Sequence, residues 1–141
     1  MPPPAAAKPT VLVVDDDRAN LQTFRIVFRD AYAITLAATG EEALQVAEAG
    51  AFDVAFVDYA MPGMNGLEVL RRLQAACPAI RRAVVTGYAD LPDIAAASAS
   101  GLAEAVVIKP WDRSTLRRIL DGLARSARGE PEPGERGGGA E

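Results

Sequence analysis

Four short runs of apolar, mostly β-branched residues are spread along the chain, at residues 11–14, 53–57, 83–86 and 105–108. Runs of this length with little polar interruption are typical of parallel strands that are buried on both faces of a sheet. A fifth segment, residues 32–36, is more mixed in character. We expect it to form a strand nearer an edge of the same sheet.

The stretches between these runs have the spacing of amphipathic helices. Thr39 and Glu42 are placed as a capping box at the start of one helix, and the acidic residues and proline of 90–93 predict the start of another. Strand and helix alternate five times, which predicts an α/β fold with a doubly wound parallel sheet and right-handed crossovers. The apolar stripes are formed by Leu21, Phe24, Val27 and Phe28, by Leu67, Leu70 and Leu73, and by Leu116, Ile119, Leu120 and Leu123.

The two ends of the chain differ in composition from this middle part. The chain has 141 residues, half of them hydrophobic, which suits one domain with a sizeable core. Residues 1–8 are rich in Pro and Ala, and residues 127–141 are dominated by Gly, Pro and Glu. We therefore predict a folded domain over 9–126, a disordered segment over 1–8, and a disordered tail or start of a linker over 127–141.

Charge and residue usage exclude several function classes. The formal net charge of −4 gives no basic footprint for nucleic acid, and no segment is apolar enough over a sufficient length for a membrane span or signal peptide. Cys77 is the only cysteine and histidine is absent, which argues against disulfides, thiolate zinc sites and Ser-His-Asp catalysis. We expect a cytoplasmic protein whose chemistry comes from carboxylates, lysine and threonine.

Polar side chains end four of the predicted strands. The first run is followed by residues 15–17, all Asp, the second by Asp58, and the last by Lys109, while Thr86 closes the third. Ligands of open α/β sheets bind beyond the carboxyl ends of the strands, so these side chains are expected to share one site. Three acidic groups there would repel each other unless a hard cation such as Mg²⁺ neutralised them.

The same residues supply what phosphoryl transfer requires. The Thr86 hydroxyl and the Lys109 ammonium group are donors for a bound anion, and Asp58, the most central carboxylate, is the natural nucleophile.

Residues 9 to about 126 resemble a response-regulator receiver domain of two-component signalling, of the single-domain, chemotaxis-regulator type. The resemblance rests on the acidic pair after the first strand, on Asp58-Tyr-Ala-Met-Pro-Gly-Met-Asn-Gly66, on Thr86-Gly87 and on Lys109-Pro110, in this order and with receiver spacing. It implies a flavodoxin-like (βα)5 fold with strand order 2-1-3-4-5.

By this resemblance, Asp58 is the phosphoacceptor and Mg²⁺ is the cofactor. Asp16 would bind the cation directly, Asp15 through water, and the carbonyl of Ala60 would be a further ligand beside Asp58.

The resemblance assigns roles to the residues around the phosphoryl group as well. Thr86 would bond a phosphoryl oxygen, Lys109 would pair with the phosphoryl group or Asp58, and the Lys109–Pro110 bond would be cis. Since the chain has no histidine, the donor would be a separate histidine kinase or phosphotransfer protein. The protein would catalyse only its own phosphorylation and dephosphorylation, and would signal by protein contact, through the face of the fourth helix, fifth strand and fifth helix.

Four positions depart from the receiver pattern or bear on regulation. Val106 stands where receivers commonly carry a switch aromatic, and Trp111 is expected to pack the start of the last helix. Ala60 and Tyr88 would line the entrance for hydrolytic water. Either Tyr88 covers the site and slows self-dephosphorylation, or it points outward into the partner-binding face.

Other functions remain open at this stage. Asp17 is expected to be a helix N-cap or a solvated neighbour of the acidic pair. The chain could be a phosphate-independent docking module, or a receiver fragment of a longer regulator or hybrid kinase. An aspartate-nucleophile phosphatase is disfavoured, because Ala60 stands where such enzymes carry a second acid. A nucleotide-binding protein would need a glycine-rich loop after the first strand, and there is none.

Overall fold

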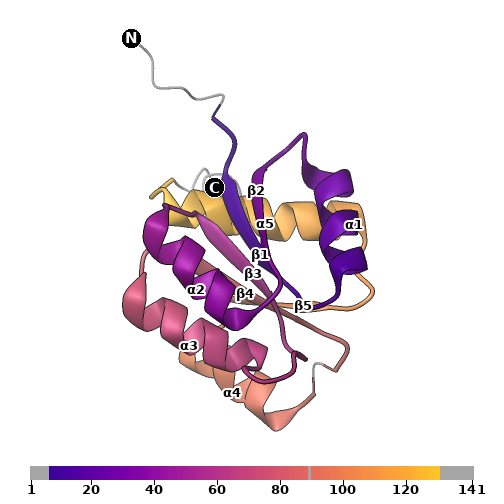
Figure 1. Cartoon of the computed structure of the whole chain (residues 1–141), viewed down its shortest axis with the longest axis vertical. Coiled ribbons are helices and arrows are strands. Elements are labelled where there is room, and N and C mark those ends of the chain that lie inside the picture. Colours follow the sequence, from indigo (N-terminus) through magenta and orange to yellow (C-terminus); the bar gives the residue numbers. More distant parts are fainter. Residues whose placement is uncertain (1–6, 89, 131–141) are drawn as a thin grey trace, which may run out of the picture.

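A computed structural model describes residues 7–88 and 90–130. Strands and helices alternate along this part of the chain, as the hydrophobic pattern predicts (Figure 1). They are β1 (Thr10–Val14), α1 (Arg18–Phe28), β2 (Ala33–Ala37), α2 (Gly40–Ala49), β3 (Val54–Asp58), α3 (Gly66–Ala76), β4 (Arg81–Thr86), α4 (Pro92–Ser100), β5 (Ala105–Ile108) and α5 (Arg113–Ala127).

All strand pairs are parallel, and the order across the sheet is β2-β1-β3-β4-β5. The predicted α/β fold class and strand order are both confirmed. The chain first winds from β1 to β2 and then crosses over to β3 on the other side of β1. The strand order therefore reverses between β1 and β3, and the carboxyl ends of these two strands open into the crevice where such folds bind ligands.

Two helical layers enclose the sheet. Alternate residues of β1 face opposite sides: Leu12 and Val14 pack with α2, α3 and α4, whereas Val11 and Val13 pack with α1 and α5. Figure 1 shows this division, with α2, α3 and α4 together on one side of the sheet. These four residues of β1 are all buried, because helices cover both faces of the strand.

The two edge strands differ in how well the sequence predicts them. The mixed segment forms β2, and it lies at an edge as expected. The prediction that residues 105–108 are buried on both faces is wrong. β5 is the opposite edge strand, with Ala105 and Val106 only partly buried and Ile108 42% exposed. An edge strand pairs on one side only, so the apolar side chains of β5 are left partly open to solvent.

Local capping follows the sequence closely. Thr39 accepts a hydrogen bond from the backbone of Glu42, whose carboxylate in turn accepts one from Ala38. Asp17 is the N-cap of α1 and accepts from the Ala19 and Asn20 amides. Both predicted helix starts are confirmed, and they hold the loops that follow β1 and β2.

The folded part reaches slightly beyond the predicted limits of 9 and 126. α5 ends at Ala127, and the Arg128 guanidinium contacts the Lys8 carbonyl at 3.3 Å and the Asp53 carboxylate at 3.0 Å. The remainder of the predicted disordered ends, residues 1–6 and 131–141, lies outside the described residues. Within 7–88 and 90–130, none of the helices has the length and apolar character needed to cross a bilayer.

Candidate functional site

Three carboxylates meet at the carboxyl ends of β1 and β3. One oxygen from each of Asp15, Asp16 and Asp58 lies within 4.8 Å of the other two. Asp15 and Asp58 are buried, whereas Asp16 is exposed. β1 ends one residue before Asp15 and β3 ends on Asp58, so adjacent parallel strands deliver both buried acids to the same rim.

Asp58 pairs with a lysine from the other side of the rim. The Lys109 ammonium nitrogen lies 2.8 Å from an Asp58 carboxylate oxygen. Burial raises the pKa of the Asp58 carboxyl, and the negative charges of Asp15 and Asp16 add to this, against the opposing effect of Lys109. Partial burial lowers the pKa of Lys109, but the hydrogen bond with Asp58 and the negative charges of Asp58, Asp15 and Asp17 together outweigh this and raise the pKa overall. Lys109 therefore stays protonated at neutral pH.

Thr86 lies at the end of β4 and is also buried. Its hydroxyl oxygen accepts a hydrogen bond from the Tyr88 amide at 3.1 Å, which leaves the hydroxyl hydrogen free to donate to an anion. The Lys109 amide donates to the Thr86 carbonyl at 2.8 Å, so the ends of β4 and β5 are held together. The Lys109–Pro110 peptide bond that follows is cis.

The donor set fits a hard divalent cation. Carboxylate oxygens are the ligands that Mg²⁺ prefers, and three of them converge here. Ala60 lies two residues beyond Asp58 and is exposed, in the loop that leads from β3 to α3. The Gly66 amide closes this loop by donating to the Tyr59 carbonyl at 2.9 Å.

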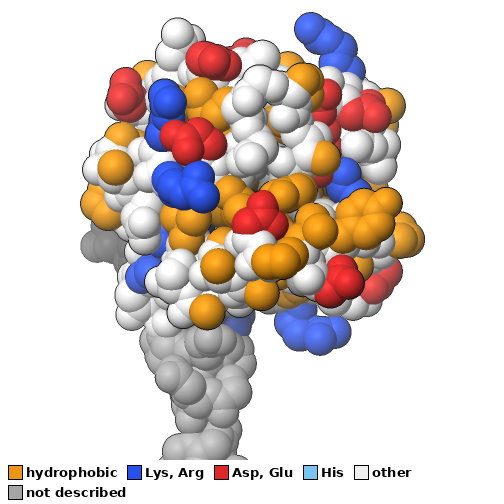
Figure 2. All heavy atoms as spheres, turned by 90° about the horizontal axis from the view of Figure 1, so that it is seen from below, with side chains coloured by type: hydrophobic (Ala, Val, Ile, Leu, Met, Phe, Trp, Pro, Cys, Tyr) orange, Lys and Arg blue, Asp and Glu red, His pale blue; other side chains and the backbone are white. Residues whose placement is uncertain are grey.

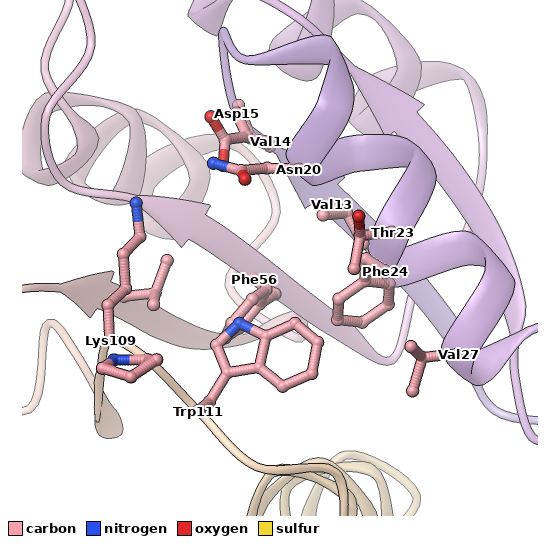
Figure 3. A pocket seen from close by; sticks show the side chains of 12 residues that line it. Val13, Val14, Asp15, Asn20, Thr23, Phe24, Val27, Phe56, Lys109 and Trp111 are labelled. Carbon is pink, nitrogen blue, oxygen red and sulfur yellow. The ribbon is translucent and has the colours of Figure 1, made fainter.

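One contact of Asp15 was not predicted from the sequence. The Asn20 side-chain amide donates to one Asp15 oxygen at 3.1 Å, and the Asp17 backbone amide donates to the other at 2.9 Å. Figure 3 shows the Asn20 amide beside the Asp15 carboxylate, at the end of α1 that faces the sheet rim. Asn20 lies in the first turn of α1, five residues beyond Asp15, and this spacing is the one sequence signal that could have identified it.

A second missed contact connects the site to α4. The Tyr59 hydroxyl donates to the Asp93 carboxylate at 2.5 Å, and this hydrogen bond raises the pKa of Tyr59. Tyr59 directly follows Asp58, and Asp93 is the second residue of α4. The loop behind the central carboxylate is thereby tied to the helix beside it.

Tyr88, Val106 and Trp111 lie in three different surroundings. Tyr88 is 69% exposed, so most of its surface faces solvent. Val106 is half-buried and lines a hollow between β5 and α4, together with Ile94, Ala99 and others. Trp111, directly before the N-cap of α5, packs against Phe24 and Phe28 of α1, with ring centroids 6.2 and 5.7 Å apart, so it has a packing role, and these contacts are with the first helix.

A hollow of about 350 Å³ opens between α1 and the segment that follows β5. Figure 3 shows the rings of Trp111 and Phe24 side by side in its lining, with Lys109 pointing up toward the rim. Its polar end is formed by Asp15, Asn20 and Lys109, so the hollow is continuous with the acidic site.

Curated proteins with similar sequences carry the names of transcriptional regulatory proteins. The chain is 30% identical over 112 residues to the transcriptional regulatory protein ZraR of Escherichia coli, and 32% identical over 130 residues to the alginate biosynthesis transcriptional regulatory protein AlgB of Pseudomonas putida. These matches cover 79% and 89% of this chain, but only 25% and 29% of the relatives. The chain thus corresponds to about a quarter of their length.

Solved structures agree with this similarity. A CheY-like response regulator receiver domain protein from Methanospirillum hungatei has a TM-score of 0.81 at 28% identity, covering 89% of this chain and all of that one. The receiver domain of the sensor histidine kinase PA1611 from Pseudomonas aeruginosa has a TM-score of 0.74 at 25% identity, covering 84% and 98%. That structure holds a magnesium ion coordinated in its active-site cleft.

The model of the response regulator receiver domain family matches residues 11–121. These residues include all three carboxylates of the site, Thr86 and Lys109. Receiver domains interact with histidine kinases or phosphotransfer proteins, and they are not a classical enzyme family. With this match, the shared fold and the acidic rim, the chain belongs to the response regulator receiver domain family of two-component signalling.

Proposed function

We propose that this chain is a phosphoacceptor that receives a phosphoryl group on Asp58 from a histidine kinase or phosphotransfer protein. The observation that carries the proposal is the placement of Asp58, which is buried at the rim between two acidic groups and a lysine 2.8 Å away. A carboxylate in this position is placed to attack phosphorus. The neighbouring Lys109 ammonium group can stabilise the negative charge of an incoming phosphoryl group.

Mg²⁺ is the proposed cofactor. Asp16 and Asp58 would hold it directly, Asp15 through water, and the Ala60 carbonyl would complete the protein ligands. When bound, the cation would relieve the repulsion among the three carboxylates and neutralise charge on the phosphoryl oxygens.

The residues of this chain each have a task in the transfer. An Asp58 oxygen attacks phosphorus, a P–O bond forms, and the P–N bond to the donor imidazole breaks, with its electron pair returning to the ring nitrogen. Lys109 then shifts its ammonium group from Asp58 toward the phosphoryl group, and the free Thr86 hydroxyl hydrogen donates to a phosphoryl oxygen.

The signal would be passed on by protein contact, in the cytoplasm, through the surface of α4, β5 and α5. Figure 2 looks at the molecule from the side where α4 lies and shows hydrophobic side chains gathered there, with acidic ones among them. Tyr88 and Ile108 are two of the large hydrophobic residues that the structure leaves exposed, at 69% and 42%. The exposure of Tyr88 supports its role in partner contact over its role as a cover of the site.

Labelling with a small acyl-phosphate donor tests the acceptor. We expect wild type to gain one phosphoryl group in the presence of Mg²⁺ and the Asp58→Asn variant to gain none, since the amide cannot act as the nucleophile. Intact mass measures both. Asp17→Asn is a matched control, because asparagine caps a helix as well as aspartate does, and it should label like wild type.

Equal labelling of wild type and the Asp58→Asn variant would place the acceptor elsewhere. A wild-type protein that takes up no phosphate under these conditions would favour the phosphate-independent docking module.

A further inference from the structure

Asn20 holds an unusual place beside the site, because its side chain reaches back from α1 to a buried carboxylate. Its amide nitrogen lies 3.1 Å from one oxygen of Asp15, and the Asp17 backbone amide lies 2.9 Å from the other. Each Asp15 oxygen therefore has one donor and keeps a further lone pair. Asp15 is only 7% exposed, so its orientation is set largely by these two protein donors.

The start of α1 fixes where Asn20 lies. The Asp17 side chain accepts hydrogen bonds from the Ala19 and Asn20 amides, and its carbonyl accepts from the Leu21 amide at 3.1 Å. Leu21 is buried and anchors this turn in the core. The Asp17 cap thereby fixes the Asn20 backbone at its amide, and the buried side chain of Leu21 fixes the next residue.

We propose that Asn20 is a positioning residue, which holds the Asp15 carboxylate in the orientation that a divalent cation requires at the acidic cluster. The inference rests on the proposed function, because it assigns Asp15 to the cation site. Without the Asn20 donor, repulsion from Asp16 and Asp58 would favour rotation of the Asp15 carboxylate away from the cluster.

The chemical type of the residue matters for this task. A lysine or arginine at position 20 would orient Asp15 equally well, but its charge would neutralise the carboxylate and compete with the cation. A neutral amide donates a hydrogen bond and leaves the negative charge of Asp15 intact. The nearby Lys109 ammonium group pairs with Asp58, whereas the donors to Asp15 are the amides of Asn20 and Asp17.

Calorimetric titration with MgCl₂ tests the role of Asn20. We expect Asn20→Ala to weaken Mg²⁺ binding by about tenfold, the lower range for loss of a group that orients a metal ligand. Thr23→Ala is the matched control, since Thr23 lies one turn further along α1 and lines the same hollow without bonding to Asp15. It should bind Mg²⁺ like wild type.

A second measurement separates positioning from a structural role. The melting temperature in EDTA should fall only modestly in the Asn20→Ala variant, because the helix preference of alanine partly offsets the lost hydrogen bond to Asp15. The rate of acyl-phosphate labelling should reach half its maximum at about tenfold higher Mg²⁺, while the maximal rate at saturating Mg²⁺ stays close to that of wild type.

The outcomes distinguish this inference from the proposed function. If Asn20→Ala and wild type bind Mg²⁺ equally while Asp58 is still labelled, positioning by Asn20 is refuted and the phosphoacceptor proposal stands. A lower maximal labelling rate at saturating Mg²⁺, or an Asn20→Ala chain that is unfolded in EDTA, would likewise overturn it. A wild-type chain that binds no Mg²⁺ would refute both.

Discussion

At the scale of single residues, Gly66 is a position where two backbone segments approach closely behind Asp58. A Cβ atom at this position would lie 2.8 Å from Tyr59 Cα and within the contact distance of the Asp58 carbonyl oxygen. These neighbours are backbone atoms at the end of β3 and cannot move aside as a flexible side chain could. The Gly66→Ala variant should therefore lose about 2 kcal/mol of unfolding free energy, in the range for overpacking of a rigid site.

Urea unfolding measures this loss, and Gly87→Ala provides the control. Nothing lies within 4 Å of a Cβ atom at Gly87, so this second alanine should be tolerated. Equal stability of Gly66→Ala and wild type would mean that the loop after Asp58 can open without cost.

At the scale of elements, Tyr32 ties the turn between α1 and β2 to α5. Its ring is buried at 2% exposure, and its hydroxyl lies 2.7 Å from an Asp121 carboxylate oxygen, to which it donates. Tyr32→Phe should lower the unfolding free energy by about 1.5 kcal/mol, the lower range for a hydrogen bond to a charged group. Thermal unfolding measures the loss, and Tyr88→Phe, at an exposed position, should leave stability unchanged.

The same contact gives stability a dependence on alkaline pH. Burial, together with the hydrogen bond to Asp121, raises the pKa of Tyr32 above its ordinary value near 10. The folded state therefore holds this proton more tightly than the unfolded state. The contribution is fully present below about pH 10 and is lost as pH rises toward the folded pKa. Tyr32→Phe should show a shallower loss of stability above pH 10, and an unchanged slope would contradict this account.

At the scale of the whole molecule, the two ends of the folded part close on each other beside β3. Arg128, just past α5, contacts the Asp53 carboxylate at 3.0 Å, and Asp53 also accepts from the Thr10 amide at 3.0 Å. Ending the chain after Glu130 should leave stability unchanged. Ending it after Ser126 removes Arg128 and should cost about 0.5 to 1 kcal/mol, as for a partly exposed ion pair.

Arg128→Ala in the full chain should reproduce the loss seen on ending at Ser126, and melting curves compare all three. A substantial loss on ending after Glu130 would instead mean that residues 131–141 contact the folded part.

Most of the fold and the principal site residues follow from local pattern. A buried parallel strand appears in the sequence as a run of apolar residues, and the residue at its carboxyl end lies at the rim of the sheet. The sequence therefore predicts that Asp15, Asp58 and Lys109 share one site. The cap residues Thr39 and Asp17 were predictable from the sequence for the same reason, because their hydrogen-bond partners are only two or three residues away.

Contacts between segments far apart in the chain could not be predicted in this way. Arg82 is an example: a charged residue inside β4, it is 5% exposed because its guanidinium donates to the Leu102 and Ile80 carbonyls and pairs with Glu104. The link from Tyr59 to Asp93 spans 34 residues and depends on how α4 packs. The residue types of each segment do not indicate which residue of the other segment it will contact.

The sequence by itself determined the alternation of strands and helices, the sheet and the acidic rim, since these depend on periodicity and on the ends of apolar runs. Only the tertiary structure decided that the side chains of β5 are partly exposed, that Asn20 turns back to Asp15, and that Arg128 closes on Asp53. The physical reason is that burial and side-chain direction depend on which segments pack together in the folded chain. The period of a helix or strand depends only on the order of its own residues.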